Sequence, residues 1–357
     1  MKNGLLVCKI SSKKKNVGDY VQSLAQEQFY DHIDCLVQRE SMNTFSSDEK
    51  VRVIMNAWFM HQPRNFPPSE CILPLFVSFH LSPKAADLFL SPETVAYLKA
   101  YGPIGTRDCA TRDLLQKHGI NAYFSGCLTL TLGNTYKTTE TSGLVYFVDP
   151  YYEFGHDESF KYVSFFNALL LLSKNYRKVM RLCKVFESEK KTIVSRISEK
   201  FDKMLHAASF YDSYSKVFDD DIIMNAHYLT QMVDLAEFGD DYKQLEHARQ
   251  LINTYARARF VVTSRIHCAL PCLGLETPVV FVNSQKLKSG KARSGGRYGG
   301  LTDLMNEMLW TPKGVIPCFD IGNPKITYSN IPSNKDDYKK LSEALTRRVR
   351  EFIANSD

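Results

Sequence analysis

The stretch "ARFVVTSRIHCALPCLGLETPVVFVN", from Ala258 to Asn283, predicts a strand, a helix and a second strand in succession. The β-branched and aromatic residues of "ARFVV" and "PVVFVN" are typical of buried strands. The segment "CALPCLG" between them favours a helix that ends at Gly274. Ser264, Arg265 and His267 then stand where the first strand ends and the helix begins, which is the sheet edge where ligands of such folds bind.

Strand-like and helix-like segments alternate along the rest of the chain. The segments "GLLVCKIS", "VRVIMNAWF", "LPLFVSFHL", "LVYFVD" and "DIIMNAHYL" are strand-like, whereas "DYVQSLAQEQFY" and "RDCATRDLLQKHGI" have helical spacing. This predicts an α/β fold with two Rossmann-like domains, each built on a parallel sheet. A polar segment, 133–143, marks the crossing between them. We expect an N-terminal domain over 1–140, a C-terminal domain over 141–330, and an amphipathic helix within 331–357 that packs back on the body.

The composition indicates a globular protein that works in a reducing compartment. The chain has 357 residues, 44% hydrophobic and 24% charged, and a net charge of +6 that permits an anionic ligand without arguing for nucleic acid. Its nine cysteines show neither CxxC spacing nor any other metal-ligand spacing, so we expect reduced thiols, a cytoplasmic protein and no metal site. The apolar run 165–172 is too short to span a bilayer, so the chain is expected at most to visit a membrane surface.

Arg265 and His267 are the strongest candidates for chemistry. A guanidinium binds phosphate or carboxylate as a planar fork, and an imidazole is the side chain best suited to move protons near neutral pH. The alternative for His267 is a hydrogen-bonded histidine of the core. Two such side chains together at the carboxyl end of a strand favour the functional interpretation.

Two earlier segments hold further candidates. In "NVGD", Gly18 would let a ligand approach the backbone at a helix N-terminus, with Asn16 beside it, and Asp19 could accept a proton from a hydroxyl or merely cap the helix. In "GPIGTRDCATRDLL", Arg107 stands at the turn from a strand into a helix that Asp108 caps. There Arg107 either projects over the sheet edge or is a surface arginine.

Two weaker candidates come from the second half of the chain. Arg297 belongs to the basic run "QKLKSGKARSGGRYGG", which follows a central strand and is either a solvated loop or a lid for an anionic ligand. His227, in "NAHY", is a candidate for contact with a second substrate, or a histidine without function.

The order of these segments resembles the polysaccharide pyruvyl transferase family. NxGD near the start, "GPIGTRDCATRDLL…GINAYFSGCLTL" in the middle and "ARFVVTSRIHCALPCLGLETPVVFV" late carry the resemblance, from about 16 to 283. It implies a two-domain fold similar to the glycosyltransferase B (GT-B) arrangement, with a cleft between the domains. It also implies transfer of a pyruvyl group from phosphoenolpyruvate onto two hydroxyls of a sugar as a cyclic ketal, with release of phosphate and no further cofactor.

The resemblance assigns expected roles to the candidates. It places Arg265 on the phosphate or carboxylate of the donor and makes His267 the general acid. The remaining candidates would line the cleft, with Ser264, Arg107 and Arg297 on the donor side and Asn16, Gly18, Asp19 and His227 on the acceptor side. Asp19 or His227 would take the proton of the acceptor hydroxyl. Where relatives tend to read Gly-Asp-Pro, this chain reads Gly126-Cys127-Leu128, so no acidic role is expected there.

The expected acceptor is a galactose-type sugar in a precursor of a surface polysaccharide such as a capsule or exopolysaccharide. That sugar is either free or lipid-linked at the inner face of the membrane. A nucleotide-sugar-dependent glycosyltransferase of the same fold is the alternative, with Arg265 and the basic run holding a diphosphate. A third interpretation is a non-catalytic sugar-binding relative, with Cys127 marking a lost function.

Overall fold

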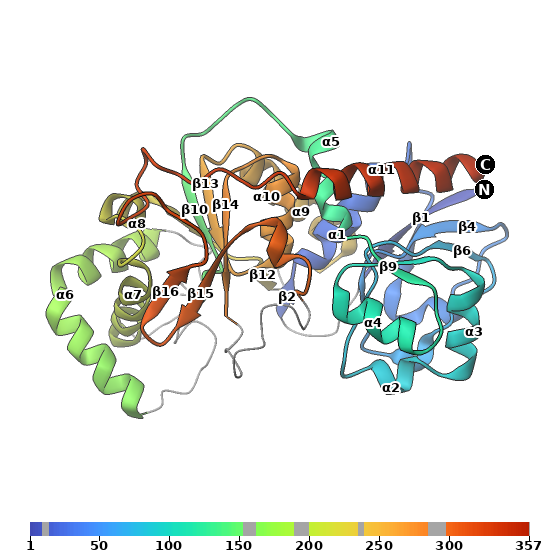
Figure 1. The fold of residues 1–357 in the computed structure, drawn as a ribbon, viewed down its shortest axis with the longest axis horizontal. Helices are drawn as coiled ribbons and strands as arrows, with labels where there is room; N and C mark the ends of the chain where they lie inside the picture. Colours follow the sequence, from blue (N-terminus) through green and yellow to red (C-terminus); the bar gives the residue numbers. More distant parts are fainter. Residues whose placement is uncertain (9–13, 153–161, 189–199, 235–238, 285–297, 357) are drawn as a thin grey trace.

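The structure is a computed structural model that describes residues 1–8, 14–152, 162–188, 200–234, 239–284 and 298–356. Two β-sheets lie next to each other along the long axis of the molecule (Figure 1). We call residues 1–140 the N-terminal part and 141–330 the C-terminal part. The sheet of the N-terminal part is wholly parallel, in the order β3 (Cys35–Gln38), β1 (Lys2–Val7), β4 (Val51–Ile54) and β6 (Ile72–Leu75).

The sheet of the C-terminal part has six strands and is mixed. Its order is β11 (His227–Leu229), β10 (Val145–Val148), β13 (Phe260–Thr263), β14 (Val279–Asn283), β15 (Asn306–Thr311) and β16 (Gly314–Pro317). Neighbours from β11 to β15 run parallel, but β16 is antiparallel to β15. The α/β class is confirmed, and the expectation of a purely parallel second sheet is wrong at this edge. A tight turn explains the reversal, because Gly314 has a φ of 108°, which favours glycine.

Three short two-stranded sheets and the helices complete the fold. The small sheets pair β2 (Lys14–Asn16) with β12 (Met232–Asp234), β5 (Trp58–Phe59) with β7 (His80–Leu81), and β8 (Ile104–Thr106) with β9 (Ala122–Phe124). The α-helices are α1 (Gly18–Glu27), α2 (Ala86–Phe89), α3 (Pro92–Ala100), α4 (Cys109–Lys117), α5 (Gly133–Tyr136), α6 (Tyr162–Ser188), α7 (Lys200–Tyr214), α8 (Asp220–Asn225), α9 (Asp241–Ala256), α10 (Ile266–Gly274) and α11 (Tyr338–Asn355). The short 3-10 helices are η1 (Arg39–Thr44), η2 (Pro63–Asn65), η3 (Leu128–Thr131) and η5 (Thr302–Leu304).

The segment "DIIMNAHYL" is not one strand. Its first residues form α8, and the strand β11 begins only at His227. The side chain of Asp219 accepts a hydrogen bond from the backbone N–H of Asp221 at 3.0 Å, which caps the helix. This cap stabilises the N-terminus of α8. The apolar run considered alone predicted a strand there and gave no sign of the helix.

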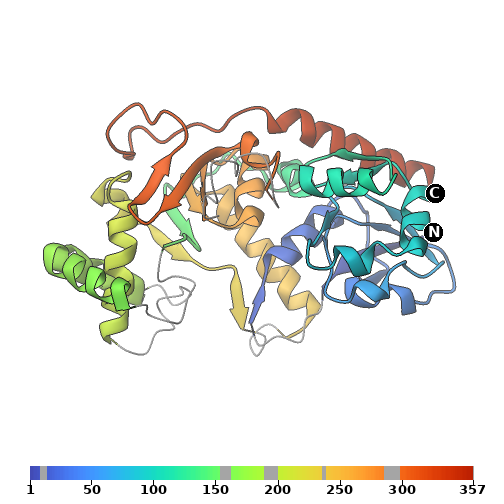
Figure 2. The ribbon, with the colours of Figure 1, turned by 60° about the horizontal axis from the view of Figure 1, so that its bottom comes forward.

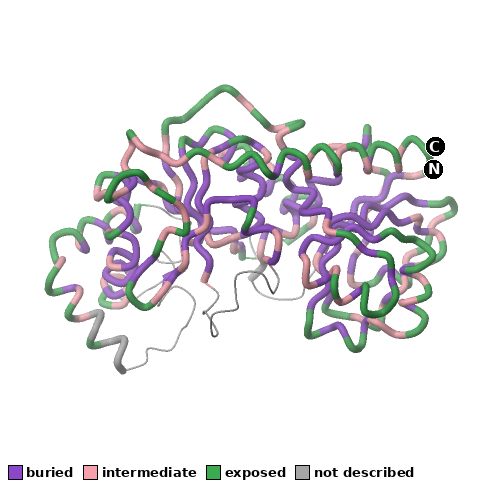
Figure 3. Tube along the Cα trace, viewed as in Figure 1, coloured by how far each residue is buried: buried purple, intermediate pink, exposed green. Residues whose placement is uncertain are grey.

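The two parts share a hydrophobic core. One buried cluster contains only N-terminal residues such as Phe59, and a second contains C-terminal residues such as Phe147. A third cluster joins Leu24 of α1 to Leu251 of α9 and Leu270 of α10, so that α1 packs against helices of the other part. Figure 3 shows buried chain running without interruption through the junction of the two parts.

Backbone pairing strengthens the same junction. Strand β2, which comes before α1, pairs antiparallel with β12 of the C-terminal part. The N–H of Val17 continues this ladder by donating to the carbonyl of Gln231 at 2.8 Å. The loop that opens α1 is therefore positioned by the C-terminal part, as Figure 2 shows from below.

Candidate active site

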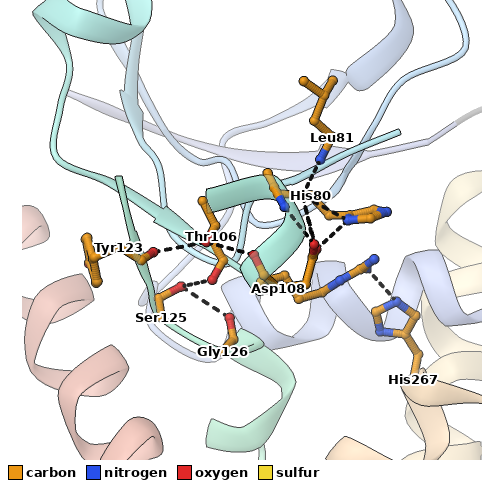
Figure 4. Close-up of polar contacts among 10 residues, drawn as sticks. His80, Leu81, Thr106, Asp108, Tyr123, Ser125, Gly126 and His267 are labelled. Carbon is orange, nitrogen blue, oxygen red and sulfur yellow. Dashed lines mark hydrogen bonds and ion pairs between the residues drawn. The ribbon is translucent and has the colours of Figure 1, made fainter. Parts of the chain in front are cut away.

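Arg107 and His267 meet where the two parts join. Nη1 of Arg107 lies 3.3 Å from Nε2 of His267, although the residues are 160 positions apart. Arg107 follows β8, and His267 belongs to the first turn of α10, which follows β13. Both residues are buried. In Figure 4, His267 reaches from the side of α10 towards the turn that carries Asp108.

The contact with Arg107 constrains which ring nitrogen of His267 can carry a proton. A guanidinium has no acceptor atom, so Arg107 must donate and Nε2 of His267 must accept. A ring nitrogen that accepts a hydrogen bond carries no proton, so this contact is a hydrogen bond only with the neutral imidazole whose proton is on Nδ1. His267 in this arrangement is ready to take up a proton rather than to give one.

A buried hydrogen bond between a carboxylate and an imidazole fixes the turn that presents Arg107. Asp108 caps α4 through the N–H of Thr111 at 2.9 Å, and its Oδ2 lies 2.5 Å from Nδ1 of His80. Burial raises the pKa of Asp108, but the hydrogen bond and charge of His80, with the charge of Arg107, outweigh it and leave that pKa below its usual value. The carboxylate therefore stays charged, and the Asp108 cap expected from the sequence is confirmed.

Arg265 is held by a carboxylate that sequence reasoning did not single out. Its Nε donates to Oδ2 of Asp149 at 2.9 Å. Asp149 follows β10, is fully buried and has a φ of 43°, a conformation that costs a non-glycine residue about 1–3 kcal/mol and is commonest at functional sites. The Arg265 side chain remains 24% exposed, so part of the guanidinium can meet a ligand. Ser264 next to it accepts a hydrogen bond from the N–H of Tyr151 at 2.9 Å.

Gln231 connects the pieces of the site. Its backbone N–H donates to Oδ2 of Asp149 at 3.0 Å, and its side-chain Nε2 donates to the carbonyl of His267 at 3.0 Å. Its own carbonyl accepts from Val17 in the loop before α1. One fully buried amide residue thus ties the Arg265 partner, the His267 backbone and the N-terminal loop together.

The loop Asn16–Gly18 lies against His267. Oδ1 of Asn16 accepts the N–H of Gly18 at 2.9 Å, so Asn16, and not Asp19, satisfies the start of α1. A β-carbon on Gly18 would lie 3.1 Å from Cβ of His267, which is tighter than an ordinary contact and explains the glycine. Asp19 is half-buried in the first turn of α1, where its carboxylate lies 3.4 Å from Nε2 of Gln22.

Two candidates are not brought to this cluster. His227 begins β11, and its ring lies 5.6 Å from that of Tyr146, which places it away from the strand ends that carry Asp149 and Arg265. Arg297 lies outside the described residues.

Cys127 stands where the resemblance led us to expect an aspartate. It is fully buried at the start of η3, and burial raises the pKa of its thiol, an effect that the charge of Arg107 partly opposes. The thiol is therefore neutral, and it lies close enough to Arg107 for the charge of the guanidinium to act on it. In the part of the chain that the structure describes, no group of three or more His, Cys, Asp or Glu side chains could hold a metal ion.

Sequence reasoning missed Asp149, Gln231 and His80. Asp149 had a usable signal, since it is the last residue of the strand-like run "LVYFVD", at the edge where Arg265 was expected. Gln231 and His80 had no such signal, because their roles in the site depend on hydrogen bonds to residues more than 25 positions away. The described helices include none that is long and apolar enough to cross a membrane.

The comparisons with known proteins agree with the motifs. The model of the polysaccharide pyruvyl transferase family matches residues 87–286, more than half of the chain. That range includes Arg107, Arg265 and His267 but not the loop at Asn16–Gly18. No curated protein and no solved structure shows a significant match. The chain belongs to the polysaccharide pyruvyl transferase family.

Proposed function

We propose that the protein transfers a pyruvyl group from phosphoenolpyruvate to two hydroxyls of a galactose-type sugar in a precursor of a surface or capsular polysaccharide. The observation that carries the proposal is the contact between Arg107 and His267, with Arg265 two positions away and anchored by Asp149. Two cations and an imidazole at one junction suit a donor that carries both a phosphate and a carboxylate. We further propose a GT-B-like arrangement, with the substrates bound where the two parts join.

The reaction needs one proton delivered and two removed. A proton adds to the methylene carbon of phosphoenolpyruvate, and the adjacent carbon gains oxocarbenium character. One sugar hydroxyl attacks that carbon and loses its proton to a base, for which Asp19 is the candidate near the loop. The second hydroxyl then displaces phosphate, which leaves with its bonding electron pair, and the proton of that hydroxyl neutralises the leaving group. General acid–base help contributes typically ~10²–10⁴-fold.

The donor itself would convert His267 into an acid. In the structure Arg107 donates a hydrogen bond to Nε2 of His267. A phosphate is a stronger acceptor for a guanidinium than an imidazole, so a bound donor would draw Arg107 onto its own oxygens. Nε2, no longer bonded to Arg107, would then take up a proton and pass it to the methylene carbon. Arg265 would offset the charge that develops on the departing phosphate.

Mass spectrometry of acceptor sugars incubated with phosphoenolpyruvate tests the proposal. The panel includes free galactosides and lipid-linked sugars, since we propose a cytoplasmic enzyme whose acceptor is offered at the inner membrane face. The mass gain of a pyruvyl ketal is expected with the wild-type chain and lost in Arg265→Ala and His267→Ala. Arg112→Ala, in an exposed ion pair on α4, is the matched control and should keep the gain.

Two results would overturn it. One is the absence of any ketal across the panel from a folded wild-type protein. The other is thermal stabilisation by UDP or GDP without any by phosphoenolpyruvate, which would identify a nucleotide-sugar glycosyltransferase. A ketal that persists in His267→Ala would instead move the acid role to another residue.

A further inference from the structure

The side chains that helix α6 exposes change from apolar to basic near an interruption of the helix at Asn175. Asn175 departs from helical geometry, with φ −120° and ψ 22°, and divides α6 into two segments. The segment before Lys174 has no charged residue. Among its described side chains, Phe166 is 65% exposed and Leu170 54% exposed. Large apolar side chains so open to water at one end of a helix mark a surface that contacts something else.

The remainder of α6 is strongly basic. The helix carries five Lys or Arg residues and one Glu, and the cations are Lys174, Arg177, Lys178, Arg181 and Lys184. Lys178 pairs with Asp220 at 2.6 Å. Within the described residues, no carboxylate lies at ion-pair distance from the other four cations. Their spacing of three, four and three residues puts them on one side of the helix, where all four are exposed.

Packing fixes this face outward. The basic segment buries Val179, Leu182 and Phe186 in the core of the C-terminal part, and α7 lies alongside it (Figure 2). The exposed side cannot rotate inward without removing those side chains from the core.

We propose that the exposed face of α6 docks on an anionic lipid surface. Phe166 and Leu170 would enter the boundary between headgroups and acyl chains while Lys174, Arg177, Arg181 and Lys184 meet lipid phosphates, as basic amphipathic helices do at membranes. A second copy of this chain fits the face less well, because two such basic faces would repel each other. The exposed side chains of Phe166 and Leu170 likewise favour lipid over nucleic acid.

Co-sedimentation of the purified full chain with vesicles tests the docking. Vesicles of phosphatidylcholine with phosphatidylglycerol should bind the chain, pure phosphatidylcholine vesicles should bind it weakly, and high salt should release it. Arg177→Glu combined with Arg181→Glu should lower partitioning onto the anionic vesicles by about 30-fold or more, because each surface cation is worth roughly a factor of five. Leu170→Ser should lower it by about tenfold.

Matched variants elsewhere separate α6 from general charge and hydrophobicity. Arg347→Glu combined with Arg350→Glu makes the same charge change on exposed positions of α11, and Leu88→Ser removes a leucine that is 56% exposed. Both controls should bind vesicles like the wild type. Failure of the wild type to bind anionic vesicles, or equal losses in the α6 and control variants, would overturn the proposal. So would a dimer that Leu170→Ser dissociates.

Vesicle binding uses neither donor nor acceptor. The docking therefore stands or falls independently of pyruvyl transfer, and the α6 variants should keep wild-type activity on a free acceptor.

Discussion

Asp149 combines an unfavourable backbone conformation with a charge that orients Arg265. Asparagine tolerates a positive φ about as well as aspartate does, so Asp149→Asn removes the charge and adds no backbone strain. A hydrogen bond to a charged group contributes about 1.5–3 kcal/mol, so the KM for phosphoenolpyruvate should rise by about 10–100-fold while kcat changes less. Steady-state kinetics at varied donor concentration measures this split.

The matched variant is Asp149→Ala. It removes the same charge and adds the strain of alanine at positive φ, so it should also unfold about 1–2 kcal/mol more easily than Asp149→Asn. Combining Asp149→Asn with Arg265→Ala should raise the donor KM no further than Arg265→Ala alone. Additive effects on KM would show that Asp149 does not act through Arg265.

His206 ties stability to pH. Burial lowers its pKa from 6.5 to about 4, an effect that nearby Asp202 partly opposes, and Nδ1 lies 3.2 Å from the hydroxyl of Tyr152. Between these two pKa values the unfolded chain binds more protons than the folded one, so the folded state loses stability as pH falls. The free energy of unfolding should drop by about 2 kcal/mol from pH 7 to about pH 5 through this residue.

Urea denaturation at several pH values tests this, with His206→Gln as the comparison. The variant lacks the titrating group, so its stability should fall less steeply over the same range, whatever its stability at pH 7. Parallel pH profiles for the two proteins would contradict the assignment.

At this scale the sequence could predict which residues are near strand ends but not which of them touch. Arg265 and His267 follow a recognisable strand, so their place at the sheet edge was predictable. The contact between His267 and Arg107 depends on how two separate sheets are joined, which no local pattern encodes. His227 shows the same limit, since its strand was recognised in part but its position along that strand was not.

Glycines allow helix α10 to pack closely against its neighbours. It ends at Gly274 as expected, yet Gly274 does not have a left-handed conformation, which appears two residues later at Glu276, with φ 60°. A β-carbon on Gly274 would lie 2.4 Å from the carbonyl oxygen of Leu130, and one on Gly133 would lie 2.0 Å from the carbonyl oxygen of Gly274. These glycines therefore allow α10 to touch η3 and α5 of the N-terminal part.

Gly274→Ala should be strongly destabilising, because the clash is with backbone and not with a flexible side chain. Overpacking typically costs about 1–3 kcal/mol, and we expect the upper end or more. Gly143→Ala is the control, since that β-carbon would meet open space and cost only the strain of its φ of 71°, about 1–2 kcal/mol. Chemical denaturation compares them, and equal costs would mean that the contact between α10 and η3 relaxes freely.

The C-terminal helix links the two parts once more. After the second sheet the chain returns to the N-terminal part as α11 (Figure 1). There Arg52 donates to the carbonyl of Ile353 at 2.9 Å, and Ser342 donates to the carbonyl of Leu130 at 3.0 Å. Leu345 and Val349 of this helix belong to the core cluster that both parts share. The amphipathic pattern predicted the helix, but only the structure shows that its buried side completes the joint core.

A joint core predicts that the molecule unfolds as one unit. The chain has two tryptophans, Trp58 in β5 of the N-terminal part and Trp310 in β15 of the C-terminal part, so each part carries one fluorescent reporter. Trp58→Phe and Trp310→Phe isolate the two signals. With the shared cluster intact, the denaturation midpoints reported by each tryptophan should coincide once the separately measured stability of each variant is taken into account.

Leu345→Ala tests whether the shared cluster causes that coincidence. The truncation should cost about 2–5 kcal/mol and lower the midpoints of both reporters together, because the side chain supports a core to which both parts contribute. Leu88→Ala, at a leucine that is 56% exposed, should leave both midpoints nearly unchanged. If Leu345→Ala lowered only the Trp58 transition, the parts would be separately folding domains that merely touch, and the position of Arg107 against His267 would then depend on docking between them.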